Sequence, residues 1–277
     1  MKSLYYLVRR NLIGVLGGIM LLGFIMIAIA PNLFSSYDPE EFVGMQFSPP
    51  DDVFPMGTDL YGRDIWSRIA HGTRISFQVS FLSVLFAAIV GVVLGMVAGY
   101  FGGVSDYIIM RFMDAIFAFP SVLLAIALVA IGGSGIESII LAITIVYVPI
   151  FARVARASAM SVREREFVTA AFAAGVGSPR ILLVHILPNI LSPIIVQMAL
   201  RLSSAITVEA ALSFLGLGAA PPTPTLGSML SEGRAFMELA PWTVLYPGLA
   251  LALVILSVNL FGDALRDMLD PRLRGTL

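Results

Sequence analysis

Residues 75–105 of the chain read ISFQVSFLSVLFAAIVGVVLGMVAGYFGGVS, 31 residues without a charged side chain. A helix rises 1.5 Å per residue, so about 20 apolar residues are enough to cross the ~30 Å hydrocarbon core of a bilayer. Two further uncharged runs, Ala115–Ile136 and Leu239–Gly262, are also long enough. The pattern predicts a protein that crosses a membrane several times.

The composition of the 277-residue chain agrees, since 58% of the residues are hydrophobic and only 13% are charged. Soluble domains carry about 25% charged residues. We therefore predict an all-α membrane protein with six transmembrane helices, at Leu12–Ala30, Phe77–Tyr100, Met113–Ile131, Ile136–Ala152, Asn189–Leu217 and Trp242–Phe261. The fourth helix is the shortest, because only 15 uncharged residues separate Glu137 from Arg153.

The first apolar stretch has two interpretations. Ala28 and Ala30 imitate the cleavage site of a signal peptide. The stretch is long for a signal peptide, and five further spans follow it, which favours a helix that stays in the mature protein.

Basic residues predict the orientation in the membrane. With both termini in the cytoplasm, twelve lysines and arginines lie inside, and four lie outside, namely Arg63, Arg68, Arg74 and Arg234. Cytoplasmic loops carry the excess of positive charge, so we expect both termini to be cytoplasmic. The predicted division is residues 1–31 (N-terminus and first helix), 32–75 (external segment), 76–262 (five-helix core, with a cytoplasmic hairpin at 153–188) and 263–277 (cytoplasmic tail).

The external segment contains the sequence GTDLYGRD, residues 57–64. Gly57 and Gly62 permit turns, and Asp64 stands four residues before Arg68, a spacing that allows an ion pair on a short helix. The segment is either a surface loop that satisfies its own charges or a surface that faces another protein.

The stretch Glu166–Pro188 combines polar ends with apolar runs on the cytoplasmic side. Alanines give its first part a smooth helical face, Gly175 ends that helix, and Ser178 before Pro179 predicts the N-cap of a second short helix. The apolar surface of this hairpin must be buried against something. Either the membrane helices of this chain or another protein covers that surface.

Features inside the predicted spans suggest close packing. Gly91, Gly95 and Gly99 recur every four residues and form a flat stripe for helix approach. Arg111 and Asp114 are three residues apart, which predicts a local pair. Prolines that interrupt helices at membrane depth are Pro120, Pro149 and Pro193.

The scarce residue types exclude several classes of protein. Lys2 is the one lysine, so no phosphate-binding loop of the GxxxxGKS or GxxxxGKT type exists here. The chain has no cysteine, and its two histidines, His71 and His185, fall on opposite sides of the predicted topology. We therefore expect no catalytic residues, no metal site and no nucleic-acid partner, the net charge being -1. An intramembrane enzyme and an ion-driven carrier remain weaker alternatives, and no internal repeat typical of such carriers is evident.

The hairpin resembles the "EAA" signature of permease subunits in ATP-binding cassette importers. The matching positions are Ala170, Ala171, Gly175, Leu187 and Pro188. Thr169 stands where that family usually has glutamate, and His185 stands where the general motif has isoleucine. In that family the hairpin is the coupling helix that sits in a groove of the ATP-hydrolysing subunit.

Two longer stretches narrow the resemblance to the dipeptide, oligopeptide and nickel permease family. They are GTDLYGRDIWSRIAHGTRISF at Gly57–Phe77 and EAALSFLGLGAAPPTPTLGSML at Glu209–Leu230, where Leu226 replaces a tryptophan usual in the family. The C-terminal DPRLRG at Asp270–Gly275 also matches.

The resemblance implies a transport subunit that works with a second permease in a heterodimer, two ATP-binding subunits and an external substrate-binding protein. The chain itself would hold no cofactor, and ATP and Mg would bind to the partner subunits. Peptides are the implied cargo, with nickel chelates, opines and oligosaccharides as alternatives. The implied ATPase-docking residues are Glu166, Thr169, Ala170, Ala171, Gly175, His185, Leu187 and Pro188, and the implied external residues on the binding-protein side are Gly57, Asp59, Gly62, Arg63 and Asp64.

Arg201 and Glu209 lie within the fifth span, where charges are costly in lipid and are expected to face protein or water. They are eight residues apart, which places them ~12 Å apart along the helix axis and ~80° apart around it. Each therefore needs its own partner. They either line the translocation pathway at the interface with the second permease or fix the packing of helices.

Overall fold

The computed structural model describes residues 12–269. Lys2, the motif at Asp270–Gly275 and parts of the predicted terminal regions 1–31 and 263–277 lie outside the described residues. Within residues 12–269 the regular elements are all helices, with one isolated bridge between Thr58 and Asp64. In order they are α2 Leu12–Ile29, α3 Pro31–Phe34, α4 Ile65–Phe101, α5 Gly103–Phe117, α6 Ser121–Gly132, α7 Ile136–Arg163, α8 Glu166–Ala173, α9 Ser178–Arg180, the π-helical η1 Ile181–Ile186, α10 Leu187–Phe214, α11 Leu226–Gly233, the 3-10 helix η2 Arg234–Phe236 and α12 Trp242–Leu269.

Five stretches of helix are long and apolar enough to cross a membrane: α2, α4, α7, α9 to α10 taken together, and α12. The helices α5 and α6 are long and apolar enough only as a pair, and they bend by 90° at the break between them, so the count is six if this pair is one span. The all-helical prediction is confirmed. The predicted span over Met113–Ile131 is interrupted, because the chain turns at Ala118–Pro120. Pro120 disfavours helical backbone at the preceding residue and so ends α5 there.

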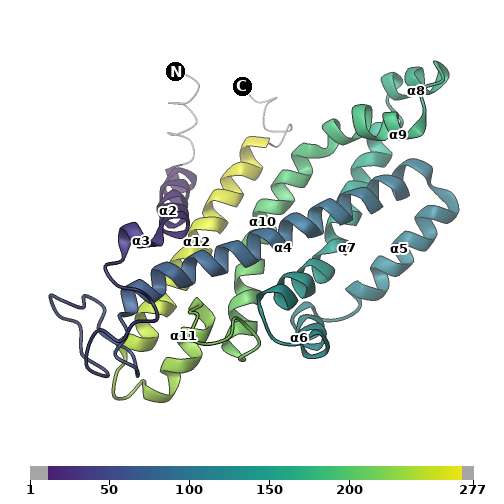
Figure 1. Cartoon of the computed structure of the whole chain (residues 1–277). Coiled ribbons are helices and arrows are strands. Elements are labelled where there is room, and N and C mark those ends of the chain that lie inside the picture. Colours follow the sequence, from purple (N-terminus) through teal and green to yellow (C-terminus); the bar gives the residue numbers. More distant parts are fainter. Residues whose placement is uncertain (1–11, 270–277) are drawn as a thin grey trace.

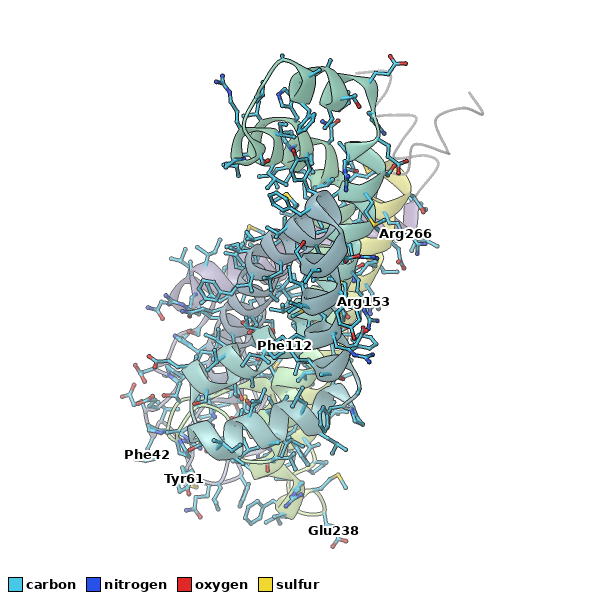
Figure 2. All side chains as sticks on the ribbon, turned by 90° about the vertical axis from the view of Figure 1, so that its right-hand side faces the viewer. Phe42, Tyr61, Phe112, Arg153, Glu238 and Arg266 are labelled. Carbon is cyan, nitrogen blue, oxygen red and sulfur yellow. The ribbon has the colours of Figure 1, made fainter. Side chains whose placement is uncertain are left out.

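The chain reverses at two opposite ends of the bundle (Figure 1). At one end, which we call the hairpin end, α2 begins, α12 ends, and α8 and α9 project beyond the other helices. At the other end lie residues 35–64, which we call the segment, and α11. We call this end the segment end. The side view agrees, with Arg266 near the hairpin end and Phe42, Tyr61 and Glu238 at the segment end (Figure 2).

Helix α4 crosses the bundle obliquely and begins twelve residues before the predicted span (Figure 1). Asp64 caps it, because its Oδ2 accepts hydrogen bonds from the Ser67 backbone N–H at 2.8 Å and from the Ser67 hydroxyl at 2.6 Å. The predicted pair of Asp64 with Arg68 on a short helix is therefore wrong. The cap engages Asp64, and Arg68 binds other carboxylates.

The glycine stripe of α4 packs against α7. A Cβ atom at Gly91 would lie 2.6 Å from the Phe151 Cβ, and one at Gly99 would lie 2.6 Å from the Arg156 carbonyl oxygen. Real Cβ atoms do not approach other atoms so closely. Small residues thus let the two backbones come together, as the spacing predicts.

Helix α7 runs unbroken through Pro149 and continues eleven residues past the predicted end at Ala152. Its arginines bind α5: Arg153 lies 2.7 Å from the Asp114 carboxylate and over the Phe117 ring, and Arg156 lies 2.6 Å from the second oxygen of Asp106. The predicted pair of Arg111 with Asp114 is wrong, because α5 lies along α7 and offers Asp114 a different arginine.

Candidate functional site

The hairpin at the hairpin end is a small packed unit. Helix α8 ends at Ala173, and Gly175 turns the chain with a φ of 76°, which a residue with a Cβ atom rarely adopts. Val168 of α8 is buried together with Ile181 and Ile186 of η1, and they belong to one hydrophobic core with α4 and α7. The base of the hairpin is therefore fixed to the bundle.

The tip of the hairpin exposes apolar side chains. Phe172 is 68% exposed, and Phe167, Leu183 and Val184 are exposed as well. Phe167 and Phe172 belong to α8, which projects beyond the other helices (Figure 1), and Leu183 and Val184 belong to η1. Within the described chain, no other element covers them.

The predicted docking residues all lie on this hairpin or at its junction with α10. Thr169 donates a hydrogen bond to the Arg165 carbonyl at 3.4 Å, and the His185 ring lies 6.4 Å from the Phe167 ring. The exposed members of the predicted set are Glu166, Thr169, Ala170, Gly175 and Pro188, and the half-buried ones are Ala171, His185 and Leu187.

The second half of the hairpin is not a separate short helix. Gly177, and not Ser178, is the N-cap residue, and it makes no side-chain cap bond. Helical backbone then continues from Ser178 to Phe214, passing through the π-helical turn of η1. Pro188 has no N–H to donate, and a wider turn before it is one way a helix accommodates that loss.

A cavity of about 650 Å³ opens between α5, α6, α7, α10 and α12. Arg201 of α10 lines it, and the Nε of Arg201 is buried with no hydrogen-bond partner in the described chain. The other polar residues that line it are Ser121, Tyr147, Ser203, Ser204, Thr207 and Asn259. Sequence reasoning missed this set, although Ser204 lies three residues after Arg201 and therefore on the same helical face.

Glu209 does not line this cavity. It is buried in α10, where its Oε1 accepts a hydrogen bond from the Ser213 hydroxyl at 2.7 Å and its Oε2 has no partner among residues 12–269. Ser76 of α4 lies beside it. The structure thus separates the two charges of the fifth span, one at a cavity and one between helices.

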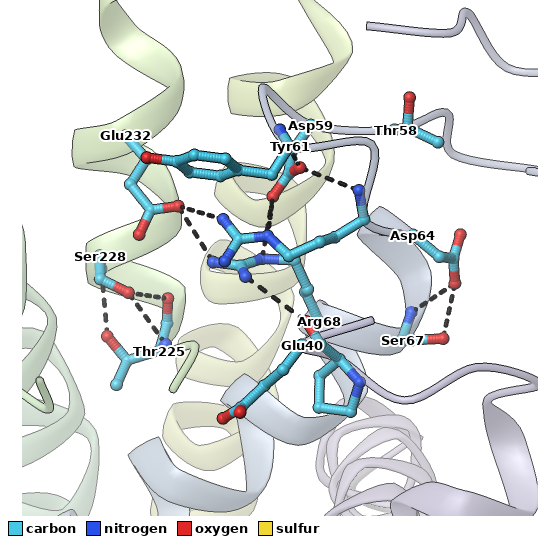
Figure 3. Close-up of polar contacts among 12 residues, drawn as sticks. Glu40, Thr58, Asp59, Tyr61, Asp64, Ser67, Arg68, Thr225, Ser228 and Glu232 are labelled. Carbon is cyan, nitrogen blue, oxygen red and sulfur yellow. Dashed lines mark hydrogen bonds and ion pairs between the residues drawn. The ribbon is translucent and has the colours of Figure 1, made fainter. Parts of the chain in front are cut away.

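An ion-pair cluster connects the segment to α11 at the segment end (Figure 3). The Asp59 carboxylate binds Arg63 Nε at 2.7 Å and Arg68 Nε at 3.5 Å. Glu232 of α11 binds the same two arginines, at 3.3 Å and 3.0 Å. Sequence reasoning missed Glu232, because it lies more than 160 residues further along the chain.

Most of the residues predicted to face an external partner are buried within the segment and are not on its surface. Gly57, Gly62, Arg63 and Asp64 are buried and Asp59 is half-buried. Gly57 and Gly62 adopt φ values of 76° and 70°. The neighbouring Thr58 carbonyl accepts a hydrogen bond from the Trp242 indole at 3.2 Å, which attaches the segment to the start of α12.

The two histidines have separate surroundings. His71 of α4 lies 2.8 Å from the Asn32 side-chain oxygen and 2.9 Å from the Ser67 carbonyl oxygen, while His185 lies in η1. Residues 12–269 contain no cluster of three or more histidine, aspartate or glutamate side chains that is suited to a metal ion.

Comparisons with known proteins bear on this arrangement. The family model described as "Binding-protein-dependent transport system inner membrane component" matches residues 91–275. The dipeptide transport system permease protein DppC of Alkalihalophilus pseudofirmus is 48% identical over 267 residues, which cover 96% of this chain and 88% of the relative. The glutathione transport system permease protein GsiD of Escherichia coli is 41% identical, over 96% of this chain and 89% of the relative.

A solved structure shares the fold. The inward-facing MetNI methionine ABC transporter superposes with a TM-score of 0.57 and 15% sequence identity, over 73% of this chain and 96% of that chain. This likeness supports the arrangement of helices. Together with the match to the family model and the similarity over nearly the full length of the two relatives, it leads to one assignment: the chain belongs to the binding-protein-dependent transport system inner membrane components, the permease subunits of ATP-binding cassette importers.

Proposed function

We propose that this chain forms one half of a peptide-translocation pathway in the inner membrane, and that its hairpin connects this pathway to ATP-hydrolysing partner subunits. The relatives with dipeptide and glutathione transport in their names support peptides as cargo. Nickel chelates, opines and oligosaccharides are the alternative cargoes for the same architecture.

The observation that carries the proposal is the hairpin itself. A protruding element with an exposed Phe172 and exposed aliphatic neighbours needs a protein cover in water. A partner that grips the hairpin can move α10 directly, because helical backbone continues from Ser178 through the whole of α10. The hairpin residues from Glu166 to Pro188 are thus the proposed ATPase-docking site.

The cavity beside Arg201 supports the second part of the proposal. Polar side chains at membrane depth face protein or water, because lipid cannot satisfy them. A different groove, between α2, α4, α10 and α12, has a volume of about 900 Å³ and an almost wholly apolar lining, as expected of a surface that faces lipid. The cavity beside Arg201 is thus the proposed half-pathway, and a second permease would complete it.

The remaining partners follow from the family. Two ATP-binding subunits would hold ATP and Mg at the hairpin end, in the cytoplasm. A substrate-binding protein would deliver cargo at the segment end. The ion-pair cluster of Asp59, Arg63, Arg68 and Glu232 would then hold the segment in place for that protein. In this proposal the chain has no catalytic role of its own.

Replacing Phe172 by serine tests the docking proposal. We expect Phe172→Ser to reduce the amount of ATP-hydrolysing subunit that copurifies with the permease by about tenfold, because a large aromatic anchor is lost from the interface. Leu239→Ser is the matched control, since Leu239 is 66% exposed against 68% for Phe172 but lies near the segment end. Unchanged copurification in Phe172→Ser, or uptake driven by an ion gradient without any ATP-hydrolysing subunit, would contradict the proposal.

A further inference from the structure

We infer that Arg201 makes the cavity an anion-binding position that holds the C-terminal carboxylate of a peptide in transit. This inference rests on the proposed function and names the chemistry of the same cavity. It identifies which end of the cargo the permease contacts. It also assigns a ligand-binding role to Arg201 and not to Glu209, whereas the sequence predicted the same role for both.

The charge of the cavity supports an anionic ligand. Arg201 is the one charged residue among those that line it, and no aspartate or glutamate offsets the guanidinium there. The Nε of Arg201 is buried without a partner in the described part of the chain. An arginine at membrane depth is ordinarily paired, so the position lacks a counter-ion that a ligand can supply.

Glu209 cannot serve as that counter-ion. It lies two helical turns further along α10, ~12 Å away along the axis. Its Oε1 already accepts the hydrogen bond from Ser213. Within residues 12–269 the carboxylates in ion pairs are Asp59, Asp106, Asp114 and Glu232, and none of these pairs includes Arg201.

The neighbouring groups complete a site for a carboxylate. A guanidinium presents a planar fork of N–H donors that matches the two oxygens of a carboxylate. Ser204 follows on the same face of α10, Tyr147 faces the cavity from α7, and Asn259 faces it from α12. Donors from three helices thus surround one space. Its volume of about 650 Å³ falls within the range of small-molecule sites and suits a short peptide.

A single arginine also suits a site that must release its ligand. Conduction requires binding that is favourable enough to admit a ligand and weak enough to let it leave. One charge with several neutral donors meets both conditions. A second cation in the cavity would hold the carboxylate more tightly and slow its exit.

The test uses the complete importer, with its binding protein and ATP-hydrolysing subunits, reconstituted in vesicles of phosphatidylcholine. Uptake of radiolabelled dialanine is compared with uptake of dialanine amide, which lacks the carboxylate. Both are measured in the wild type, in Arg201→Gln and in Arg201→Lys. Because the binding protein has its own preference, the informative quantity is the change in the acid-to-amide ratio between variants.

We expect Arg201→Gln to lower the acid-to-amide ratio about tenfold, the size expected for the loss of one charge-assisted hydrogen-bonded contact. Arg201→Lys keeps the charge, so its acid-to-amide ratio should fall between those of the wild type and Arg201→Gln. Arg266→Gln is the control for net charge, since Arg266 is exposed near the end of α12 and does not line the cavity.

An equal loss of both substrates in Arg201→Gln, or no change in the ratio, would overturn the inference while leaving the proposed function intact. A wild-type importer that takes up neither peptide with ATP would instead overturn the proposed function. If the effect of Arg201→Gln appears only when phosphatidylglycerol is added to the vesicles, the anion at Arg201 is a lipid phosphate, and the inference is wrong.

Discussion

At Gly95 a single hydrogen atom faces the carbonyl oxygen of Ala152 on the neighbouring helix. A Cβ atom there would overlap that oxygen and would also lie 2.8 Å from the Ala155 Cβ. Backbone atoms on α7 cannot move aside as the end of a flexible side chain can. The α4–α7 contact, which forms much of the main hydrophobic core, therefore depends on the absence of a side chain at this residue.

Gly95→Val should destabilise the purified permease by about 1–3 kcal/mol, the usual cost of overpacking a core. The measurement is thermal unfolding in a mild detergent. Gly23→Val in α2 is the control, because nothing lies within 4 Å of a Cβ atom at Gly23. If Gly95→Val melts at the same temperature as Gly23→Val, the close packing of α4 on α7 is not what stabilises the bundle.

Single residues were predictable where the chemistry is local. The glycine stripe of α4 predicted close helix packing, because a four-residue repeat of glycine has few other uses in an apolar helix. The partner of Asp114 was not predictable from spacing. Arg111 has the right spacing, but Arg153 reaches Asp114 from α7, and such a contact depends on how two helices lie side by side.

At the scale of elements, the segment at residues 35–64 is attached to the rest of the chain by few but specific contacts. Asp59 bonds the backbone N–H groups of Tyr61 and Arg63 as well as the Arg63 and Arg68 side chains. The two arginines then reach Glu232 of α11, whose start is fixed by the reciprocal hydrogen bonds of Thr225 and Ser228 (Figure 3). Asp59 thus holds both the turn within the segment and the two arginines that bind α11.

Asp59→Asn should loosen the fold of the segment and weaken its hold on α4. The substitution leaves Arg63 and Arg68, both buried, with the half-exposed Glu232 as their remaining carboxylate partner, and a lost charged hydrogen bond costs about 1.5–3 kcal/mol. The readout is the rate of limited proteolysis within residues 35–64. Asp52→Asn is the control, because Asp52 is exposed. Equal proteolysis rates in the two variants would show that the cluster does not hold the segment.

Helix existence was predicted more accurately than helix ends. The sequence placed the end of α2 and the start of α12 within one residue, because prolines bound those apolar runs. It placed the start of α4 twelve residues too late, because polar side chains of the first turns bind the segment: Ser67 bonds Asp64, and Arg68 bonds Asp59. It also ended the second helix of the hairpin before α10, whereas helical backbone continues from Ser178 to Phe214.

For the whole molecule, the central expectation is that the hairpin end faces the cytoplasm. The chain contains no cysteine, so single cysteines report on position without background. Ala174→Cys marks the hairpin end, and Met237→Cys marks the exposed surface of the segment end.

In spheroplasts, a membrane-impermeant maleimide should label Met237→Cys and should label Ala174→Cys only after the membrane is dissolved in detergent. The positive-inside rule gives this direction, because the arginines of the hairpin end favour the cytoplasm. Labelling of Ala174→Cys in spheroplasts, with Met237→Cys protected, would reverse the topology and remove the basis for an ATPase at the hairpin.

The overall architecture was predictable from the sequence, whereas the cavity was not. Apolar runs and arginine positions gave the helices and an expected orientation, and the hairpin motif led to the family. The cavity combines Tyr147, Arg201 and Asn259 from three helices. No local pattern connects residues more than fifty positions apart, so only the packed structure brings them together.

The uninterrupted helical backbone from Ser178 to Phe214, ~55 Å long at 1.5 Å per residue, has a thermodynamic consequence for the proposed importer. Linkage between two sites is reciprocal. If nucleotide bound to the partner subunit at the hairpin changes the affinity for cargo beside Arg201 by some factor, cargo must change the affinity for nucleotide by the same factor. An equilibrium titration with nucleotide, run with and without peptide, therefore measures from the opposite direction the same coupling free energy between the two sites.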